Sequence, residues 1–452
     1  MSMENNVSIG VVGAGLAGCE VAWQLAMRGI PVTLYEMRPK VTTPAHKTAL
    51  PAELVCSNSL KSLDVSNAHG LLKSEMELAG SLIVKSAKNN SLPAGQALAV
   101  DRECFSKDID QQLSACPQIT RQNIEVKDIL SLKKEHSHII LATGPLTSDD
   151  LSASLFSLLD DDGLFFYDAI APVVFTDSVD MTVAFKASRY GKGDSDYINC
   201  PMNRVEYYRL MDNLVSSEKV PFNSFEQAKH FEGCLPVEVM ASRGPDTLSF
   251  GPMKPVGLID PRSGEQPYAV LQLRQENMSG TLFNLVGCQT RMVWSEQERV
   301  FRQIPGLEKC EFARLGSMHR NTYVNAPKHL KANLELEKQK GIYLSGQITG
   351  VEGYVESASM GIWVAMCIFA EITGITAPQP DPHTMIGALV NYLMTASKDR
   401  FQPMNSNFGL ITPYSGEKKL KKKDKRLYLS ELALVNWQNQ LMQLNWDKIS
   451  AD

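Results

Sequence analysis

The chain has 452 residues, of which 44% are hydrophobic and 21% are charged, and this predicts a globular protein with two or more domains. The net charge of −5 comes from 45 basic and 50 acidic residues, and it excludes a chain that is polybasic throughout. Any contact with nucleic acid must therefore come from a local patch.

The sequence predicts a cytoplasmic protein that does not contact a membrane. It enters a strand-like run at once, without a basic and then apolar leader. The longest uncharged apolar run, residues 361–370, has 10 residues, whereas a membrane-spanning helix needs about 20. The nine cysteines are scattered, with no CxxC pair. Free thiols in a reducing compartment are expected, with no disulfide framework and no metal site.

Residues 7–36 predict a strand, a glycine turn, a helix and a second strand. Residues 13–18 read GAGLAG, a GxGxxG motif that brings the start of a helix against a pyrophosphate. Glu36 follows Gly18 by 18 residues, where a carboxylate accepts hydrogen bonds from ribose hydroxyls. The predicted dinucleotide contacts are Gly13, Ala14, Gly15, Leu16, Ala17, Gly18 and Glu36.

Two later segments carry further glycines that predict contact with the same ligand. Residues 138–144 read HIILATG, a buried-type strand that ends at Gly144. Residues 341–353 contain four glycines and precede a helix predicted over residues 357–373. A strand, glycine and helix unit of this kind returns to the first sheet and places Gly346, Gly353 and Tyr354 near a flavin. An ordinary strand end and an ordinary helix start are the alternatives for these glycines.

The segment between these units has a different character, with mixed strand-like and helical runs and recurring turn signals such as RGPD at residues 243–246. The predicted fold class is therefore α/β. A Rossmann-type FAD-binding domain of the glutathione-reductase kind is formed by residues 1–178 and 326–452, and an inserted α+β domain is formed by residues 179–325.

The single glycine fingerprint favours one tightly bound FAD that is reduced by a visiting NAD(P)H. Two cysteines lie in settings that suit chemistry. Cys56 is in a polar loop, Cys-Ser-Asn-Ser, with Lys61 nearby, and such a setting favours a thiolate. Cys234 lies between Gly233 and a nearby proline, in a predicted turn. A small buried hydrophobic residue is the alternative for either cysteine.

Long segments of the chain resemble the TrmFO family of folate- and FAD-dependent tRNA (uracil-5-)-methyltransferases, relatives of the flavoprotein GidA (MnmG). The matching segments are GAGLAG (13–18), LVCSNSLKS (54–62), ATGPLTS (142–148), FEGCLPVE (231–238), FGPMKPVGLIDPR (250–262), PYAVLQLRQEN (267–277), MHRNTYVNAP (318–327) and GQITGVEGYVESA (346–358). The chain departs from the family pattern at residues 286–294, where Cys288 and Arg291 replace the more usual aromatic residue and histidine.

The resemblance implies that methylenetetrahydrofolate supplies a one-carbon unit to uracil C5, at the uridine of the tRNA T-loop, with reduced FAD as the hydride donor. It also implies that Cys234 attacks uracil C6, that Cys56 acts beside the flavin, and that Tyr354 stacks on the flavin or the pterin. The division of roles between the two cysteines stays open, and a packing role for Tyr354 is the alternative. Some relatives act on ribosomal RNA, and no obligatory protein partner is expected.

Three other functions remain as hypotheses. The first is a GidA-like modification of a wobble uridine, although GidA proteins are longer. The second is a flavin-containing RNA-binding or assembly protein without methyl transfer. The third is a plain NAD(P)H oxidase, which the missing CxxC disfavours. The basic run at residues 417–426, EKKLKKKDKR, is either a solvated surface or a contact with RNA phosphates.

Overall fold

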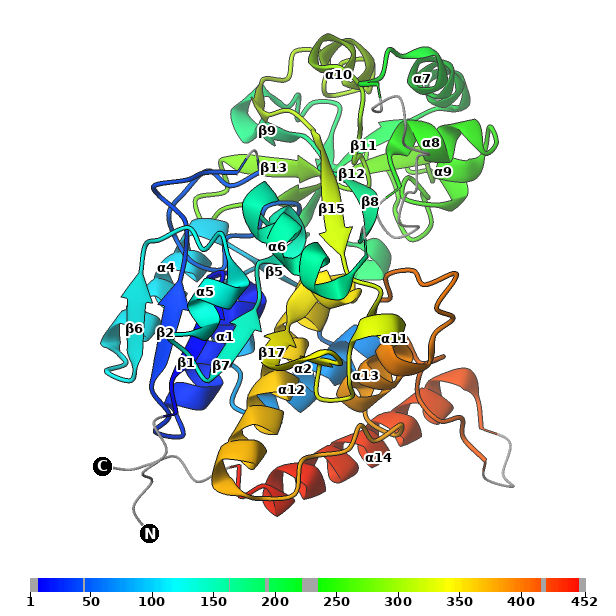
Figure 1. The fold of residues 1–452 in the computed structure, drawn as a ribbon. Helices are drawn as coiled ribbons and strands as arrows, with labels where there is room; N and C mark the ends of the chain where they lie inside the picture. The colour runs from blue at the N-terminus through cyan, green and yellow to red at the C-terminus, as the bar shows by residue number, and fades with distance from the viewer. Residues whose placement is uncertain are drawn as a thin grey trace.

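The computed structural model describes residues 7–43, 45–161, 163–191, 195–221, 235–415 and 420–446. A six-stranded sheet forms the centre of the first domain, in the order β16-β17-β7-β1-β2-β6 (Figure 1). Neighbouring strands are parallel except at the edge pair of β16 and β17. The strands are β1 (Ile9–Val12), β2 (Val32–Tyr35), β6 (Ile119–Gln122), β7 (His138–Leu141), β16 (Glu335–Leu336) and β17 (Gln339–Leu344).

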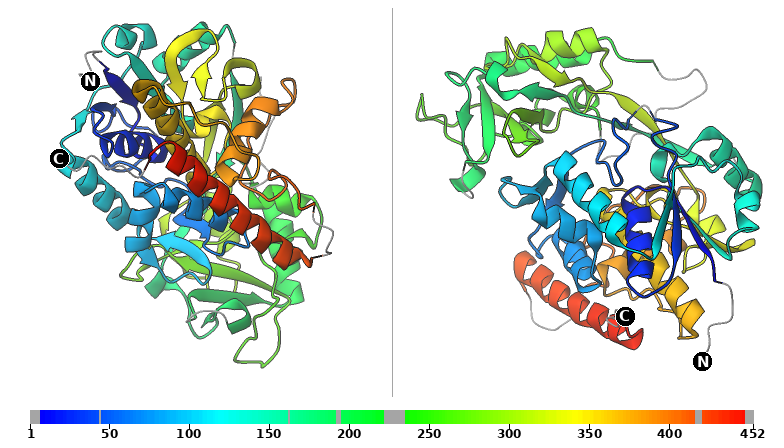
Figure 2. Two further views of the ribbon diagram at one scale, coloured as in Figure 1. Left: turned by 90° about the horizontal axis from the view of Figure 1, so that it is seen from below. Right: turned by 90° about the vertical axis from the view of Figure 1, so that its left-hand side faces the viewer.

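Helices cover this sheet, and a small three-stranded sheet in the order β3-β5-β4 lies beside it. Helix α14 lies on the side of the domain that faces away from the second domain (Figures 1 and 2). The elements are α1 (Leu16–Ala26), β3 (Ser59–Ser62), α2 (Ala68–Leu78), α3 (Leu82–Asn89), β4 (Ser91–Leu92), β5 (Ala97–Val100), α4 (Arg102–Ala115), α5 (Ile129–Lys133), α6 (Asp149–Leu159), α11 (Ala326–His329), α12 (Tyr354–Thr373), α13 (Met385–Thr395) and α14 (Lys422–Gln443).

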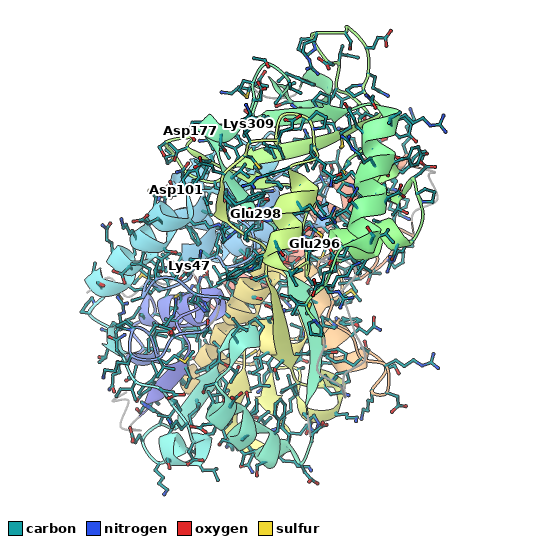
Figure 3. All side chains as sticks on the ribbon, turned by 90° about the horizontal axis from the view of Figure 1, so that it is seen from above. Lys47, Asp101, Asp177, Glu296, Glu298 and Lys309 are labelled. Atoms are coloured by element: carbon teal, nitrogen blue, oxygen red, sulfur yellow. The ribbon has the colours of Figure 1, made fainter. Side chains whose placement is uncertain are left out.

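The second domain contains a separate sheet in the order β10-β11-β12-β13-β9-β14, whose strands pair antiparallel. Helices pack on it, and Figure 3 shows Glu296 and Glu298 on one of them, α10. The elements are β9 (Val173–Phe175), β10 (Phe185–Lys186), β11 (Tyr197–Met202), α7 (Arg204–Ser216), α8 (Val237–Ser242), α9 (Thr247–Phe250), β12 (Ala269–Gln275), β13 (Leu282–Leu285), α10 (Trp294–Phe301) and β14 (Phe312–Arg314).

A two-stranded antiparallel ribbon joins the two domains. It consists of β8 (Leu164–Ala169) and β15 (Met318–Tyr323), which lie between the two larger sheets in Figure 1. The chain therefore leaves the first domain along β8 and returns along β15. The predicted fold class is confirmed. The division at residues 179 and 325 stays a prediction, although the sheet of the inserted domain also contains β9, which begins at Val173.

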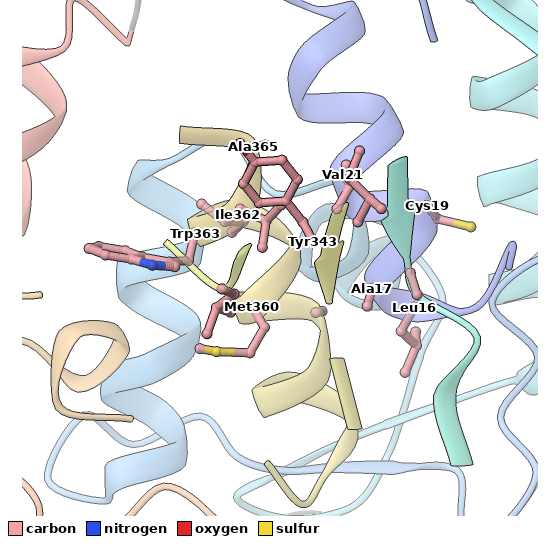
Figure 4. Close-up of a cluster of buried hydrophobic side chains, with 14 of the residues drawn as sticks. Leu16, Ala17, Cys19, Val21, Tyr343, Met360, Ile362, Trp363 and Ala365 are labelled. Atoms are coloured by element: carbon pink, nitrogen blue, oxygen red, sulfur yellow. The ribbon is translucent and has the colours of Figure 1, made fainter. Parts of the chain in front are cut away.

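Helices α1 and α12 pack against each other at the centre of the first domain, and Figure 4 shows Val21 of α1 and Ile362 of α12 in this core. Helix α12 is long and apolar enough to cross a membrane, but 83% of its apolar window is buried inside the protein. We therefore assign α12 as a core helix. It begins at Tyr354, three residues before the predicted start, because Gly353 with a φ of 122° ends the preceding loop there.

Candidate active site

The GxGxxG turn connects β1 to α1 as the sequence predicts. Gly13 has a φ of 99°, and a Cβ atom on Gly18 would overlap the carbonyl oxygen of Gly13. A Cβ atom on Gly15 would meet nothing closer than the Ala142 carbonyl oxygen at 4.0 Å, so space remains at the start of the helix. No side chain caps the first turn of α1. The backbone N–H groups of this first turn therefore have no side-chain acceptor. Together with the helix dipole, they suit a phosphate group.

Glu36 lies at the end of β2, where it faces this turn. Its Oε2 accepts a hydrogen bond from the backbone N–H of Ala14 at 2.9 Å, and its Oε1 forms an ion pair with Arg38 at 3.0 Å. Burial disfavours the charge of Glu36, but the contacts with Arg38 and Ala14 outweigh it and hold the pKa of Glu36 below its usual value. Glu36 is thus an ionised carboxylate beside the turn, where a ribose hydroxyl would compete with the donors of Arg38 and Ala14 for its oxygens.

Two cavities lie along the first domain. The smaller, about 70 Å³, is lined by Gly13, Gly15 and Glu36, three of the predicted dinucleotide contacts. Ala14, Leu16, Ala17 and Gly18 form the buried remainder of the turn and the first turn of α1. The larger cavity, about 270 Å³, is lined by Cys56, Gly353 and Tyr354. The structure therefore brings one predicted catalytic cysteine next to the start of α12.

The other two predicted glycines, Gly346 and Gly144, follow strands β17 and β7. Gly346 is buried with a φ of 81°, and a Cβ atom there would come within 2.7 Å of the Ala17 side chain. Gly144, with a φ of 66°, begins a short turn whose next two residues, Pro145 and Leu146, line the larger cavity. Gly346 thus permits close approach of α1 to the turn after β17, whereas Gly144 supplies only the positive φ of the turn after β7.

Tyr354 begins helix α12, and its hydroxyl oxygen holds the loop that carries Cys56. It accepts hydrogen bonds from the backbone N–H groups of Cys56 at 2.7 Å and Ser57 at 3.2 Å. Burial raises the pKa of Tyr354, so the phenol stays neutral. The observed role of this residue is to position the loop, and the predicted stacking on a flavin or pterin stays a prediction.

Two arginines that were not predicted from the sequence also hold residues 54–58, which we call the Cys56 loop. Arg102, at the start of α4, donates to the carbonyl oxygens of Leu54 at 2.8 Å and Cys56 at 3.4 Å. Arg274, on β12 of the inserted domain, donates to Ser57 Oγ at 2.8 Å. Both side chains come from elements distant in sequence, so no local pattern connects them to Cys56.

Cys234 lies outside the described residues. The segment that follows it is anchored beside the larger cavity, because the backbone N–H of Val237 donates to the Gln289 carbonyl at 2.7 Å, and Gln289 lines that cavity. Buried Glu238 accepts hydrogen bonds from the backbone N–H of Arg291 and from Thr290 Oγ1, both at 2.9 Å. Neighbouring Cys288 is fully buried, and burial raises the pKa of its thiol.

The residues present fit a dinucleotide such as FAD. The glycine turn offers uncapped N–H groups, Glu36 offers a ribose acceptor, and the start of α12 carries no side-chain cap where it meets the larger cavity. The smaller cavity lies at the carboxyl ends of the neighbouring strands β1 and β7, and the larger cavity is lined by the turn that follows β7. This is the position at which open α/β sheets bind their ligands.

Comparison with known proteins agrees with this geometry. The model of the family "Glucose inhibited division protein A" matches residues 8–376. A protein of Desulforudis audaxviator named "Methylenetetrahydrofolate--tRNA-(uracil-5-)-methyltransferase TrmFO" is 51% identical over 94% of this chain and 96% of its own length. The protein of that name from Geobacter sulfurreducens is 52% identical over 95% of this chain and 97% of its own. The chain belongs to the TrmFO family.

Solved structures show the same fold in GidA. Aquifex aeolicus GidA in its form I crystal superimposes with a TM-score of 0.70 at 15% identity, covering 98% of this chain and 76% of that chain. The form II crystal gives a TM-score of 0.69 at 14% identity, covering 97% of this chain and 73% of that chain. The TrmFO resemblance seen in the sequence is thus confirmed, and GidA is the longer protein.

Proposed function

We propose that this chain methylates C5 of a uracil in tRNA, with methylenetetrahydrofolate as the carbon donor and FAD as the redox cofactor. The observation that carries the proposal is the identity of about half of all residues, over nearly the whole chain, with relatives that bear this name. The geometry supports it, since Cys56 lies in a cavity at the position where the fold would place the flavin.

The residues that would hold FAD run along both cavities. The start of α1 would bind the pyrophosphate, Glu36 the ribose, and Gly353 with Tyr354 would lie at the flavin end. When bound, FAD supplies the hydride that completes the methyl group. We infer that NAD(P)H restores the reduced cofactor as a visiting co-substrate, because the chain carries one GxGxxG fingerprint.

Uracil C5 needs activation, because it is a poor nucleophile. A thiolate that adds to C6 sends an electron pair toward C5 and O4, and loss of the C5 proton and of the thiolate later restores the ring. We assign the addition to Cys234 and a role beside the cofactor to Cys56. The anchoring of residues 235–238 next to Gln289 supports this assignment, since it tethers the segment after Cys234 at the cavity wall.

The target uracil must leave its base stack to enter the larger cavity. RNA recognition should therefore depend on loop shape and phosphate contacts more than on linear sequence. We propose the T-loop uridine of tRNA as the target, with a ribosomal RNA uridine or a GidA-like wobble uridine as alternatives. We place the enzyme in the cytoplasm without an obligatory protein partner.

The decisive experiment incubates the FAD-loaded protein with methylenetetrahydrofolate, NAD(P)H and either tRNA or rRNA, followed by mass analysis of the uridines. New 5-methyluridine in the T-loop supports the proposal. Cys56→Ala and Cys234→Ala should each abolish methylation, whereas Cys104→Ala, which changes an exposed thiol on α4, should not. Normal methylation by both of the first two variants would refute the thiol mechanism.

A further inference from the structure

Arg274 is a buried cation in the wall of the cavity that contains Cys56. Its side chain is 9% exposed. Nε donates to Asn58 Oδ1 at 3.0 Å, and a terminal guanidinium nitrogen donates to Ser57 Oγ at 2.8 Å. Both acceptors are neutral. Within the described part of the chain, no carboxylate lies at ion-pair distance from Arg274, so the groups that hold this guanidinium do not neutralise it.

Burial of the Arg274 guanidinium without a carboxylate partner is energetically unfavourable unless an anion forms close by. Removing a cation from water is unfavourable unless an opposite charge compensates it. Burial lowers the pKa of Arg274 from its ordinary value, yet a guanidinium stays protonated in proteins. Asn58, fully buried, fixes the acceptors in place by donating to the carbonyl oxygens of Val100 at 3.1 Å and Gln275 at 2.8 Å. The charge is therefore held rigidly at the loop.

We propose that Arg274 holds the sulfur of Cys56 as a thiolate, so that the inserted domain activates a cysteine of the FAD-binding domain. Ser57, which Arg274 contacts, is the residue next to Cys56, and a nearby cation favours the thiolate over the thiol. The proton of the thiol is released to water. The inference rests on the proposed function, in which Cys56 acts beside the cofactor.

The other arginine of the loop has a different role. Arg102 forms an ion pair with Glu276 at 2.8 Å, so its charge is largely compensated, and its contacts with the carbonyl oxygens of the loop shape the backbone. Figure 3 shows Asp101, the residue before Arg102, and the backbone N–H of Met278 donates to Asp101 Oδ2 at 2.8 Å. Both domains thus meet at the Cys56 loop. Glu276 also favours the charge of Arg274, but its ion pair is with Arg102, so the charge of Arg274 is only partly compensated.

Other described polar groups also lie around Cys56. Half-buried Arg314 on β14 adds a further cation, and Tyr354 is neutral. The Sγ of Cys56 donates a hydrogen bond to the carbonyl oxygen of Ala169 at 3.7 Å, and deprotonation of the thiol gives up this contact. The charged groups elsewhere in the cavity wall are Lys61, Glu352 and Glu356. Glu356 is engaged by His69 and Ser406, and Glu352 accepts a hydrogen bond from Gln347.

The test measures the alkylation of Cys56 by iodoacetamide in the FAD-loaded protein over a series of pH values, with peptide mass spectrometry as the readout. The thiolate attacks the methylene carbon and iodide leaves. In Arg274→Gln the midpoint of Cys56 alkylation should move to higher pH, and the rate at neutral pH should fall about tenfold. Arg274→Lys, which keeps the charge, should recover most of the rate.

Two controls separate this role from a structural one. Cys104, exposed on α4, reports general reactivity within each sample and should not change. Arg262→Gln removes an equal charge from the inserted domain at a side chain that lines a different cavity, and should leave Cys56 unchanged. If the flavin shields the sulfur from iodoacetamide, the thiolate absorbance of the protein minus that of Cys56→Ser gives the same midpoint.

An identical midpoint in the wild-type protein and Arg274→Gln would overturn the proposal, as would a failure of Arg274→Lys to recover the rate in a folded, flavin-loaded variant. Neither readout requires methyl transfer. The methylation assay tests the proposed reaction, and the alkylation of Cys56 tests the role of Arg274. A failure of one proposal can therefore be distinguished from a failure of the other.

Discussion

The hydroxyl of Tyr354 accepts a hydrogen bond from the backbone N–H of Cys56 at 2.7 Å, although the two residues are 298 positions apart. This contact joins the first residue of α12 to the Cys56 loop. The half of the domain that precedes the insertion is thereby fixed to the half that follows it, at the cavity where chemistry is proposed. The site consequently depends on both halves being folded together.

Tyr354→Phe should weaken this connection and lower the rate of methyl transfer while FAD remains bound. The substitution removes the acceptor for two backbone N–H groups, and each unsatisfied buried donor costs about 1–3 kcal/mol. Urea unfolding of both proteins measures the change in stability. Tyr428→Phe, at an exposed tyrosine on α14, is the matched control. Equal stability and activity in Tyr354→Phe and the wild type would exclude a positioning role for the hydroxyl.

Gly18→Ala should yield protein without FAD, because the added methyl group would overlap the Gly13 carbonyl oxygen and push α1 away from β1. The uncapped N–H groups would then no longer point at the pyrophosphate. The flavin absorbance per protein, measured after purification and after adding FAD, checks the result. Gly80→Ala is the control for backbone strain without overlap, since Gly80 has a φ of 76° but a Cβ atom there meets nothing within 4 Å; it should lower stability and leave the FAD content unchanged. A yellow Gly18→Ala protein with normal FAD content would contradict this account of the turn.

Glu238→Ala should raise the KM for RNA or folate, or lower kcat, without loss of FAD. Buried Glu238 binds the backbone N–H of Arg291 and the hydroxyl of Thr290, and so fixes the segment that contains Gln289 in the cavity wall. Removal of the Glu238 carboxylate should therefore let both this part of the cavity wall and the start of α8 move. Steady-state kinetics with Glu265→Ala as the comparison measures the effect, because Glu265 is exposed and lines another cavity. Unchanged constants would show that the wall does not need this anchor.

Glu75 should make the protein less stable as the pH rises. Its buried carboxyl accepts hydrogen bonds from the backbone N–H groups of Met385 and Ile386, and burial raises its pKa from 4.5 to about 8. Between these two pH values the folded state keeps a proton that the unfolded state has lost. The stabilisation is therefore complete below pH 4.5 and is lost as the pH passes 8. Over this interval the folding equilibrium constant should fall about tenfold for each increase of one in pH.

Melting temperatures measured between pH 4.5 and pH 9 check this expectation. Glu75→Gln cannot titrate, so its melting temperature should change less over this interval, and the melting temperature of the wild type should fall relative to that of Glu75→Gln as the pH rises. Parallel curves for the wild type and Glu75→Gln would place the pH dependence in other groups.

The sequence by itself determined the dinucleotide-binding unit. Gly13, Gly15 and Gly18 act through the backbone geometry of one turn, and Glu36 follows at the end of the next strand. These residues lie close together in the sequence, so the spacing of residue types is enough to predict how they are arranged. The parallel sheet and the return of the chain after the insertion followed from the same strand, glycine and helix pattern at residues 341–353.

Only the tertiary structure decided what surrounds Cys56. Arg102, Arg274 and Tyr354 reach its loop from α4, β12 and α12, elements that lie far apart in the sequence and in two domains. The sequence around each of these side chains shows no motif or periodicity that would predict its contact with the Cys56 loop. The charge and hydrogen bonding at the cysteine arise from long-range packing, and that packing exists only once the inserted domain is folded against the sheet.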